Sequence, residues 1–155
     1  MEPELHPDVA VLAPLLGTWE GSGNGEYPTI DDFAYLESIT FGHVGKPFVA
    51  YTQRTRSPEG KPLHAETGYY RFGDNGVELV IAQPTGVVEV HEGRIEDNRI
   101  VFHQVGLASA PTAVEVEEVR RTLEVDGDLL SYTLDMAAVG QPLTFHLVAQ
   151  LQRRA

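Results

Sequence analysis

Histidine is the residue type of this sequence with the widest choice of chemistry, because a neutral imidazole binds metals and a titrating one moves protons near neutral pH. The chain contains six: His6, His43, His64, His91, His103 and His146. No two of them stand as His-x-His, and no His-Glu-x-x-His segment occurs, so spacing alone predicts no zinc site. Cysteine is absent from the sequence, which excludes thiolate metal sites, cysteine nucleophiles and disulfides.

His146 stands in the apolar segment 142–149. In an extended strand, one face of this segment carries Leu143, Phe145 and Leu147, and the other carries Thr144, His146 and Val148. Because burial disfavours the charged form of histidine, a neutral imidazole is expected here. Two interpretations stay open: a ligand for a metal or a haem iron, and a structural histidine satisfied by a hydrogen bond.

His64 and Glu66 are two residues apart and therefore share one face of a strand. With a distant second histidine they would form a two-histidine, one-carboxylate metal site. The competing interpretation is a satisfied hydrogen bond or a cofactor contact on a barrel wall. A hydrolase has no support, since neither a Ser-His-Asp order nor a Gly-x-Ser-x-Gly segment is present.

The glycine-rich segment 17–25 reads Gly-Thr-Trp-Glu-Gly-Ser-Gly-Asn-Gly. It lacks the lysine and the strand-to-helix context of a phosphate-binding loop. We interpret the glycines as allowing the first strand to bend and to approach another backbone closely, with Trp19 plugging one end of the fold.

The elements that must position these residues are strands, because the hydrophobic pattern has a period of two from Gly17 to the C-terminus. Strands are predicted near Trp19 and over 35–43, 48–55, 66–72, 77–83, 87–93, 99–105, 114–125, 130–136 and 143–152. A short amphipathic helix is predicted before them, capped by Asp8, with Val9, Leu12, Ala13 and Leu16 on one face. Pro14 should shorten or tighten this helix.

Short strands joined by tight hairpins predict an all-β fold, an up-and-down antiparallel barrel of about ten strands. A barrel of more than about eight strands is too wide for its own side chains to fill, so an internal ligand cavity is expected. The 155 residues suit one domain, residues 1–155.

The formal net charge of −12 argues against nucleic acid or an anionic membrane as the main partner, because both require a basic surface. No apolar run reaches the roughly 18 residues of a membrane span, and no targeting segment stands at the N-terminus. A cytoplasmic location is therefore expected.

Several segments together resemble the nitrobindin family of haem-binding β-barrels, in shared order and spacing from about Pro7 to Gln152. They are residues 15–23 (Leu-Leu-Gly-Thr-Trp-Glu-Gly-Ser-Gly), 27–30 (Tyr-Pro-Thr-Ile), 43–47 (His-Val-Gly-Lys-Pro), 61–69 (Lys-Pro-Leu-His-Ala-Glu-Thr-Gly-Tyr), 84–90 (Pro-Thr-Gly-Val-Val-Glu-Val) and 141–147 (Gln-Pro-Leu-Thr-Phe-His-Leu).

The resemblance implies a ten-stranded barrel like that of fatty-acid-binding proteins or lipocalins, with haem b held near one open end. His146 falls at the position of the family's iron ligand, and Thr29 at that of a haem contact, expected at a propionate. The resemblance places His64 and Met136 in the lining of the pocket, with Leu63 and Gln83 as further candidates. The absence of cysteine agrees with non-covalent haem.

One position departs from the family pattern. Many relatives read Thr-Ala-Lys-Glu-Val where this chain has Val114 in Thr-Ala-Val-Glu-Val. The lysine that would contact the haem is therefore missing, which should weaken the hold on a propionate without removing the iron ligand.

By resemblance, the function is that of a peroxynitrite isomerase that yields nitrate at a ferric haem and that also binds nitric oxide on the reduced iron. The alternatives are a carrier of an apolar ligand such as a fatty acid or free haem, a nitric oxide sensor without turnover, and a mononuclear metal enzyme built on His64 and Glu66. Since relatives often pair as dimers, a homodimer is a candidate assembly.

Overall fold

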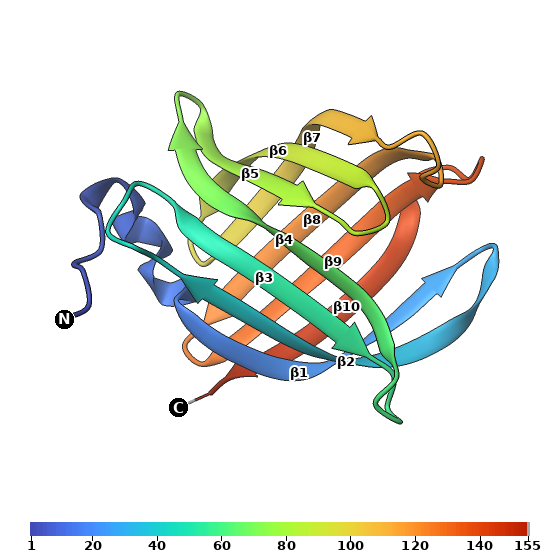
Figure 1. Cartoon of the computed structure of the whole chain (residues 1–155), viewed down its shortest axis with the longest axis horizontal. Coiled ribbons are helices and arrows are strands. Elements are labelled where there is room, and N and C mark those ends of the chain that lie inside the picture. The colour runs from blue at the N-terminus through green and yellow to red at the C-terminus, as the bar shows by residue number, and fades with distance from the viewer. Residues whose placement is uncertain (155) are drawn as a thin grey trace.

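Ten antiparallel strands close into one barrel in the computed structural model, which describes residues 1–154 (Figure 1). The strands are β1 (Gly17–Tyr27), β2 (Ile30–Gly42), β3 (Val49–Arg56), β4 (Pro62–Gly73), β5 (Gly76–Ala82), β6 (Val87–Glu96), β7 (Arg99–Ser109), β8 (Val116–Asp126), β9 (Leu129–Ala138) and β10 (Thr144–Arg153). Each pairs with the next along the chain, and β1 also pairs with β10. The predicted up-and-down barrel is confirmed; Ala155 of the predicted domain lies outside the described residues.

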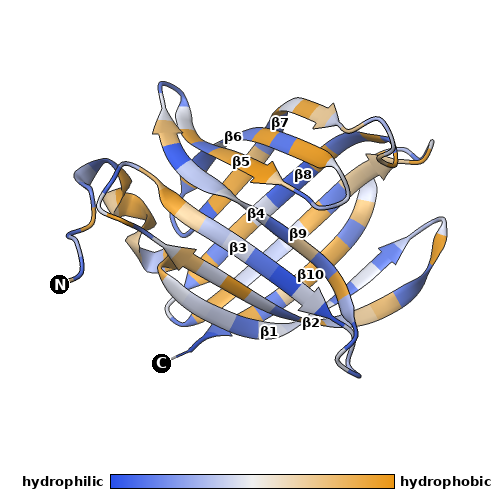
Figure 2. Ribbon diagram, in the orientation of Figure 1, coloured by the Kyte–Doolittle hydropathy of each residue, from blue (hydrophilic) through white to orange (hydrophobic). Residues whose placement is uncertain are grey.

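Alternation of apolar and polar residues decides which side chains enter the barrel, and Figure 2 shows it as bands of colour along β8 and β9. Along β5, Val77, Leu79 and Ile81 are buried while the residues between them are more exposed. Several strands are longer than predicted, because hairpin pairing continues up to the turns. β2, for example, begins at Ile30, which pairs with Tyr27 across a two-residue turn.

The helix before the barrel is a 3-10 helix, η1 (Pro7–Leu15). Its buried residues are Val9, Leu12 and Leu15 rather than the predicted Val9, Leu12, Ala13 and Leu16, because three residues per turn align every third side chain. The prediction that Asp8 caps the helix is wrong: the His6 side chain accepts the Asp8 amide at 3.2 Å. Within residues 1–154 no helix is long and apolar enough to cross a membrane.

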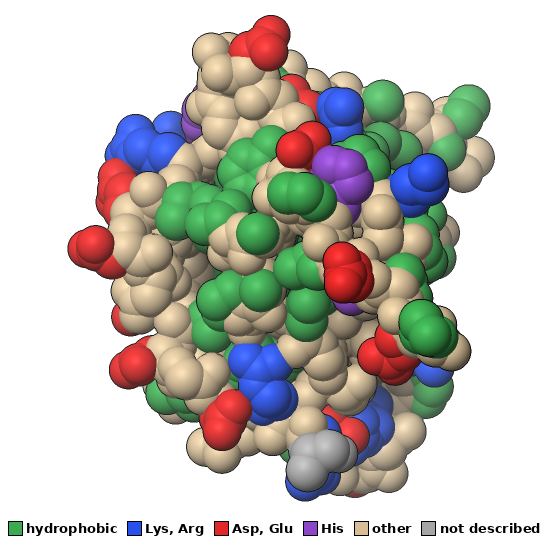
Figure 3. Space-filling view, turned by 90° about the vertical axis from the view of Figure 1, so that its left-hand side faces the viewer, with side chains coloured by type: hydrophobic (Ala, Val, Ile, Leu, Met, Phe, Trp, Pro, Cys, Tyr) green, Lys and Arg blue, Asp and Glu red, His purple; other side chains and the backbone are tan. Residues whose placement is uncertain are grey.

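One end of the barrel is closed by η1 and Trp19. Trp19 is fully buried, and its indole N–H donates to the Leu15 carbonyl at 2.8 Å. Arg153 of β10 lies 4.2 Å from the centroid of the indole ring and donates to the carbonyls of Leu16 and Pro14. Figure 3 looks onto this end, where apolar side chains gather across the middle and charged side chains surround them. The predicted plug at Trp19 is confirmed.

The glycines of β1 allow close approach, as predicted. A Cβ at Gly21 would overlap the Gln150 carbonyl on β10, and one at Gly23 would overlap the ring of Tyr35. Any side chain there would displace backbone or a buried ring. The glycines therefore let β1 close the barrel and let Tyr35 fold over it into the interior.

Candidate functional site

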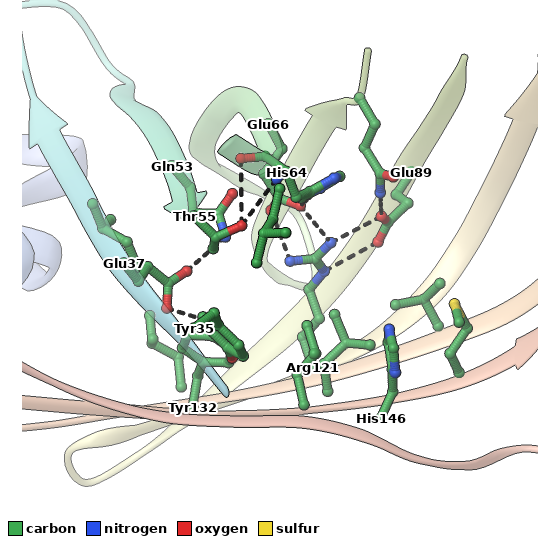
Figure 4. Close-up of a pocket in the computed structure, with 18 of the residues that line it drawn as sticks. Tyr35, Glu37, Gln53, Thr55, His64, Glu66, Glu89, Arg121, Tyr132 and His146 are labelled. Carbon is green, nitrogen blue, oxygen red and sulfur yellow. Dashed lines mark hydrogen bonds and ion pairs between the residues drawn. The ribbon is translucent and has the colours of Figure 1, made fainter. Parts of the chain in front are cut away.

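The barrel encloses a cavity of about 480 Å³, which is within the usual range for cofactor and ligand sites. Figure 4 shows part of its lining. One part, called the His146 wall below, is largely apolar and comprises Phe33, Val119, Leu134, Met136, His146 and Leu147. The other, called the polar wall, comprises Glu37, Gln53, Glu66, Glu89, Arg121 and Tyr132.

A β-bulge turns His146 into the cavity. Phe145 pairs with Asp135 and Leu147 pairs with Leu134, so His146 is the extra residue between two regular pairs. A bulged residue interrupts the alternation of side chains, and here His146 and Leu147 both line the cavity. The predicted face shared by Leu143, Phe145 and Leu147 is therefore wrong for Phe145, which lines a separate shallow hollow instead.

The ring of His146 is held by one hydrogen bond and two aromatic contacts. Its Nδ1 lies 3.0 Å from the Glu26 carbonyl oxygen, and the ring centroid lies 5.3 Å from that of Tyr27 and 6.3 Å from that of Phe33. Since a carbonyl oxygen only accepts, Nδ1 carries the proton, and in the neutral ring Nε2 keeps its lone pair. Metal-binding histidines usually donate their second ring N–H to an acceptor in this way, which leaves the other nitrogen free for the metal.

The hydroxyl of Tyr27 supports the bulge from the neighbouring strand. It accepts the Ala138 amide at 2.8 Å, and its single proton is shared between the Met136 and Ala138 carbonyls, at 3.1 Å and 3.2 Å. The end of β9 is thereby joined to β1 next to β10. These hydrogen bonds hold the Tyr27 ring in place, and that ring in turn packs edge-on against the His146 ring.

Most of the predicted pocket residues do line the cavity. Leu63, His64, Gln83 and Met136 all contribute to it, on β4, the loop after β5, and β9. Thr29 lies instead on the exposed turn between β1 and β2, outside the lining. Thr29 and His146 are nevertheless near in the fold, because the strands joined by that turn carry Tyr27 and Phe33, which contact the His146 ring.

His64 and Glu66 do share a face of β4, and His64 Nε2 lies 3.2 Å from Glu66 Oε1. No group of three histidine, aspartate or glutamate side chains suited to a metal ion occurs in residues 1–154. The pair is therefore hydrogen-bonded, and among the described residues no second histidine completes a mononuclear metal site with it.

Arg121 is one of the cavity residues that sequence reasoning missed. Its guanidinium donates to Glu66 at 2.9 and 3.3 Å and to Glu89 at 2.9 and 3.1 Å. Glu66 also accepts the Tyr51 hydroxyl at 2.9 Å, and Glu89 accepts from His91 Nε2 at 2.8 Å and from Gln83. The result is a buried network with one cation between two carboxylates.

The network shifts the acidity of its members. Burial alone would raise the pKa of Glu66, but the Arg121 charge and the His64 hydrogen bond outweigh burial and lower it to about 2. The same balance of burial against Arg121 and His91 lowers the pKa of Glu89. Both side chains are therefore ionised at neutral pH.

Glu37 has a different environment. Its carboxylate accepts hydrogen bonds from Gln53 Nε2 at 2.6 Å and from the Tyr132 hydroxyl at 2.7 Å, and Tyr132 is in turn 2.8 Å from the Tyr35 hydroxyl. None of these groups is cationic. Burial consequently raises the pKa of Glu37 to about 7, in spite of the two hydrogen bonds.

A signal for the polar wall was present in the sequence. Glu37 stands between Tyr35 and Ile39, and Arg121 between Val119 and Leu123, at positions of the alternation that face inward. Charged residues in inward phase on several strands predict a buried polar network. Which of them meet depends on strand register and barrel closure, which the pattern alone does not give.

Comparison with known proteins gives consistent results. The family model described as "THAP4-like, heme-binding beta-barrel domain" matches residues 8–153. "Peroxynitrite isomerase 2" of Mycobacterium avium is 52% identical over 162 residues, covering 99% of each chain. "Peroxynitrite isomerase" of Nocardia farcinica is 50% identical over 155 residues, covering 96% of this chain and 92% of the relative. The solved structure "Crystal Structure of Rv2717c from M. tuberculosis" matches with a TM-score of 0.89 at 48% identity, covering 98% of this chain and 100% of that one.

Proposed function

We propose that this chain, which belongs to the nitrobindin family of THAP4-like, heme-binding β-barrel domains, binds haem b through His146 and isomerises peroxynitrite to nitrate. The observation that carries the proposal is the His146 ring, whose Nδ1 is hydrogen-bonded to a backbone carbonyl while the ring lines the cavity. The family membership supports haem, and the names of the relatives support peroxynitrite as substrate.

The residues present fit a haem group. His146 offers Nε2, with the tautomer fixed by the Glu26 carbonyl, as a nitrogen ligand. Leu134, Met136 and Leu147 supply an apolar surface for a porphyrin face. Without cysteine the attachment is non-covalent.

The remaining contacts follow from position. Leu63, His64 and Met136 are proposed to line the haem pocket, since each contributes to the same cavity as His146. Thr29, exposed on the β1–β2 turn, is proposed to contact a propionate, because its hydroxyl is a donor next to solvent.

When bound, the haem iron supplies a Lewis acid and one-electron centre for the rearrangement of ONOO⁻ to nitrate. His146 would hold that centre, and the hydrogen bond from its Nδ1 to the Glu26 carbonyl would keep the ring oriented and raise its basicity. The apolar side chains of the His146 wall would limit the access of water to the bound group. Binding of nitric oxide to the same centre belongs to this proposal.

The charges of the cavity disfavour a fatty-acid carrier. A buried fatty-acid carboxylate needs a cation, and Arg121 is the one lysine or arginine that lines the cavity among the described residues. Its guanidinium is already paired with Glu66 and Glu89. A third carboxylate would meet uncompensated negative charge.

The test is a titration of the haem-free chain with haemin, for wild type, His146→Ala and His103→Ala. His103 is exposed on β7 and outside the cavity lining, so it is the matched control. We expect a Soret band that saturates at one haem per chain in wild type and His103→Ala, and that is lost or shifted in His146→Ala. An unchanged band in His146→Ala would contradict the proposed ligand.

Stopped-flow decay of peroxynitrite then tests the activity. The ferric wild-type protein should accelerate decay beyond free haemin and should raise the yield of nitrate, while His146→Ala should not. Haem binding with nitrosyl formation but no acceleration beyond free haemin would instead identify a nitric oxide sensor.

A further inference from the structure

His64 is a second histidine that lines the cavity, and it stands on β4. It has the same inward phase as Glu66 and Tyr70, two buried residues of that strand. Its side chain is 32% exposed, so a small molecule in the cavity can reach the ring. Figure 4 shows His64 beside Glu66 and apart from His146.

One nitrogen of the His64 ring is engaged by a carboxylate. Its Nε2 lies 3.2 Å from Glu66 Oε1. Although burial opposes the charge, Arg121 lowers the pKa of Glu66 to about 2, so this carboxylate is ionised and only accepts hydrogen bonds. Nε2 of His64 therefore carries a proton, and in the neutral ring Nδ1 keeps its lone pair.

The other nitrogen of the ring, Nδ1 of His64, is free and accessible. No hydrogen bond to it occurs within residues 1–154, and it is not one of the buried side-chain atoms without a partner, which are Gln53 Oε1 and His91 Nδ1. His91 is the instructive comparison, because its Nε2 lies 2.8 Å from Glu89 Oε1 while its side chain is fully buried. Of these two histidine–carboxylate pairs, only that of His64 offers its second nitrogen to a ligand.

The groups around His64 favour a positive charge on its ring. Arg121 and the Tyr51 hydroxyl hold the Glu66 carboxylate through hydrogen bonds of 2.9 Å each. The guanidinium and the two ionised carboxylates, from Glu66 and Glu89, carry one positive and two negative charges, so a proton taken up by His64 neutralises the cluster. The neighbours of β4, which are β3 and β5, place no charged side chain on their inward faces.

We propose that His64 accepts a proton at Nδ1 from an O–H group of a ligand in the cavity, and that Glu66 is the residue that positions it. The identity of the ligand rests on the proposed function, under which it is peroxynitrous acid, the conjugate acid of peroxynitrite. The O–H bond of the ligand breaks, the Nδ1–H bond forms, and the imidazolium stays against the Glu66 carboxylate.

The proton balance of the reaction gives this step its purpose. Nitrate and a proton together contain the atoms and electrons of peroxynitrous acid, so the rearrangement consumes no oxidant or reductant but does release one proton. His64 receives that proton, and the exposed part of its ring returns it to solvent.

Nitrogen-15 NMR of the haem-free full chain, labelled at histidine, tests the arrangement without haem or peroxynitrite. At alkaline pH, wild type and Glu124→Gln should show His64 with its proton on Nε2 alone; Glu124 is a half-exposed carboxylate outside the cavity lining. Glu66→Gln should show both tautomers, because an amide donates as well as accepts, and His64→Leu assigns the signals. A proton on Nδ1 of His64 in wild type would overturn the proposal, whether or not Glu66→Gln folds. An unchanged tautomer in Glu66→Gln would overturn the positioning role of Glu66.

Stopped-flow isomerisation by the ferric protein tests the proton transfer itself. Rate constants per bound haem are measured from about pH 5.5 to 8.5 for wild type, His64→Leu and His103→Leu. The ratio of wild type to His64→Leu should pass through a maximum of at least about tenfold, because an acceptor must be neutral while its donor is protonated. The ratio for His103, which is exposed and outside the cavity lining, should stay near one at every pH.

The kinetic results separate this proposal from the proposed function. A ratio of wild type to His64→Leu that does not change with pH would mean that His64 acts through structure alone, and would overturn the proton transfer. No acceleration by wild type beyond free haemin would refute the proposed function and, with it, peroxynitrous acid as the ligand. The second failure is seen in wild type alone, so the two are distinguishable.

Discussion

On the His146 wall a polar ring makes one hydrogen bond, to the Glu26 carbonyl, whereas on the polar wall Arg121 makes four, to Glu66 and Glu89. The two side chains come from β10 and β8, which flank β9 in the same barrel, and both line the same cavity. The first arrangement leaves a ring nitrogen available for a ligand. In the Arg121 network both carboxylates are paired with the guanidinium, so the charge of Arg121 is not available to bind an anionic ligand.

The difference separates a binding role from a structural one. A group prepared for a ligand keeps one atom free and is oriented through the others, which is the situation of His146. A buried ion network is stable only while its members stay paired, and removing one leaves uncompensated charge. Glu37 and Gln53 lie between these cases, because they are hydrogen-bonded to each other while Gln53 Oε1 has no partner among the described residues.

Removal of the Arg121 cation should have the largest effect on the stability of the protein. We expect Arg121→Met to lower the free energy of unfolding by about 3–5 kcal/mol, because two buried carboxylates lose their partner. Urea unfolding followed by tryptophan fluorescence measures this loss. Arg94→Met is the control. The Arg94 and Glu96 side chains are 73% and 46% exposed, so their ion pair should contribute less than about 1 kcal/mol to the free energy of unfolding.

A compensating variant sharpens the result. Arg121→Met combined with Glu66→Gln and Glu89→Gln removes the charges together and should recover most of the lost stability, as replaced buried ion networks do. If Arg121→Met lowered the free energy of unfolding no more than Arg94→Met does, the Arg121 network would not stabilise the fold.

The two kinds of buried carboxylate should also respond to pH in opposite directions. The folded pKa of Glu66, about 2, lies below its ordinary 4.5, so the unfolded chain binds more protons between these values and stability is lost as pH falls from about 4.5 to 2. The folded pKa of Glu37, about 7, lies above 4.5, so stability is lost as pH rises from about 4.5 to 7. Each shift corresponds to roughly 3 kcal/mol.

These opposite pH dependences are tested by measuring the free energy of unfolding of wild type and Glu37→Gln from pH 3 to 8. The Glu37→Gln profile should lack the decline between about 4.5 and 7 and should keep the acid limb. Parallel profiles for the two proteins would mean that Glu37 does not titrate differently in the folded state.

Pattern and resemblance predicted the barrel, the Trp19 plug and the cavity, because alternation and hairpin signals are local. They did not predict the bulge at His146. A bulge is one extra residue in one of two paired strands, and the apolar–polar alternation of the sequence shows no interruption at this position. The meeting of Arg121 with Glu66, 55 residues away in sequence, depends on barrel closure. Thr29 and the role of His146 as iron ligand stay predictions from the resemblance.

The smallest expected effect concerns the rim of the His146 side. Val114, 63% exposed in the segment before β8, occupies the position where the resemblance expects a lysine. Val114→Lys should raise the affinity for haemin by at most about fivefold, because an exposed ion pair with a propionate contributes about 1 kcal/mol or less, and added salt should reduce the gain. The control is Val105→Lys, at a 52% exposed valine on β7 outside the cavity lining. Since the chain carries a net charge of −12, any new lysine attracts anionic haemin to some degree.

Only a gain in affinity that is specific to Val114→Lys therefore places a propionate beside this residue. Equal gains from both variants would mean general electrostatic attraction and would leave the missing family lysine without a local role.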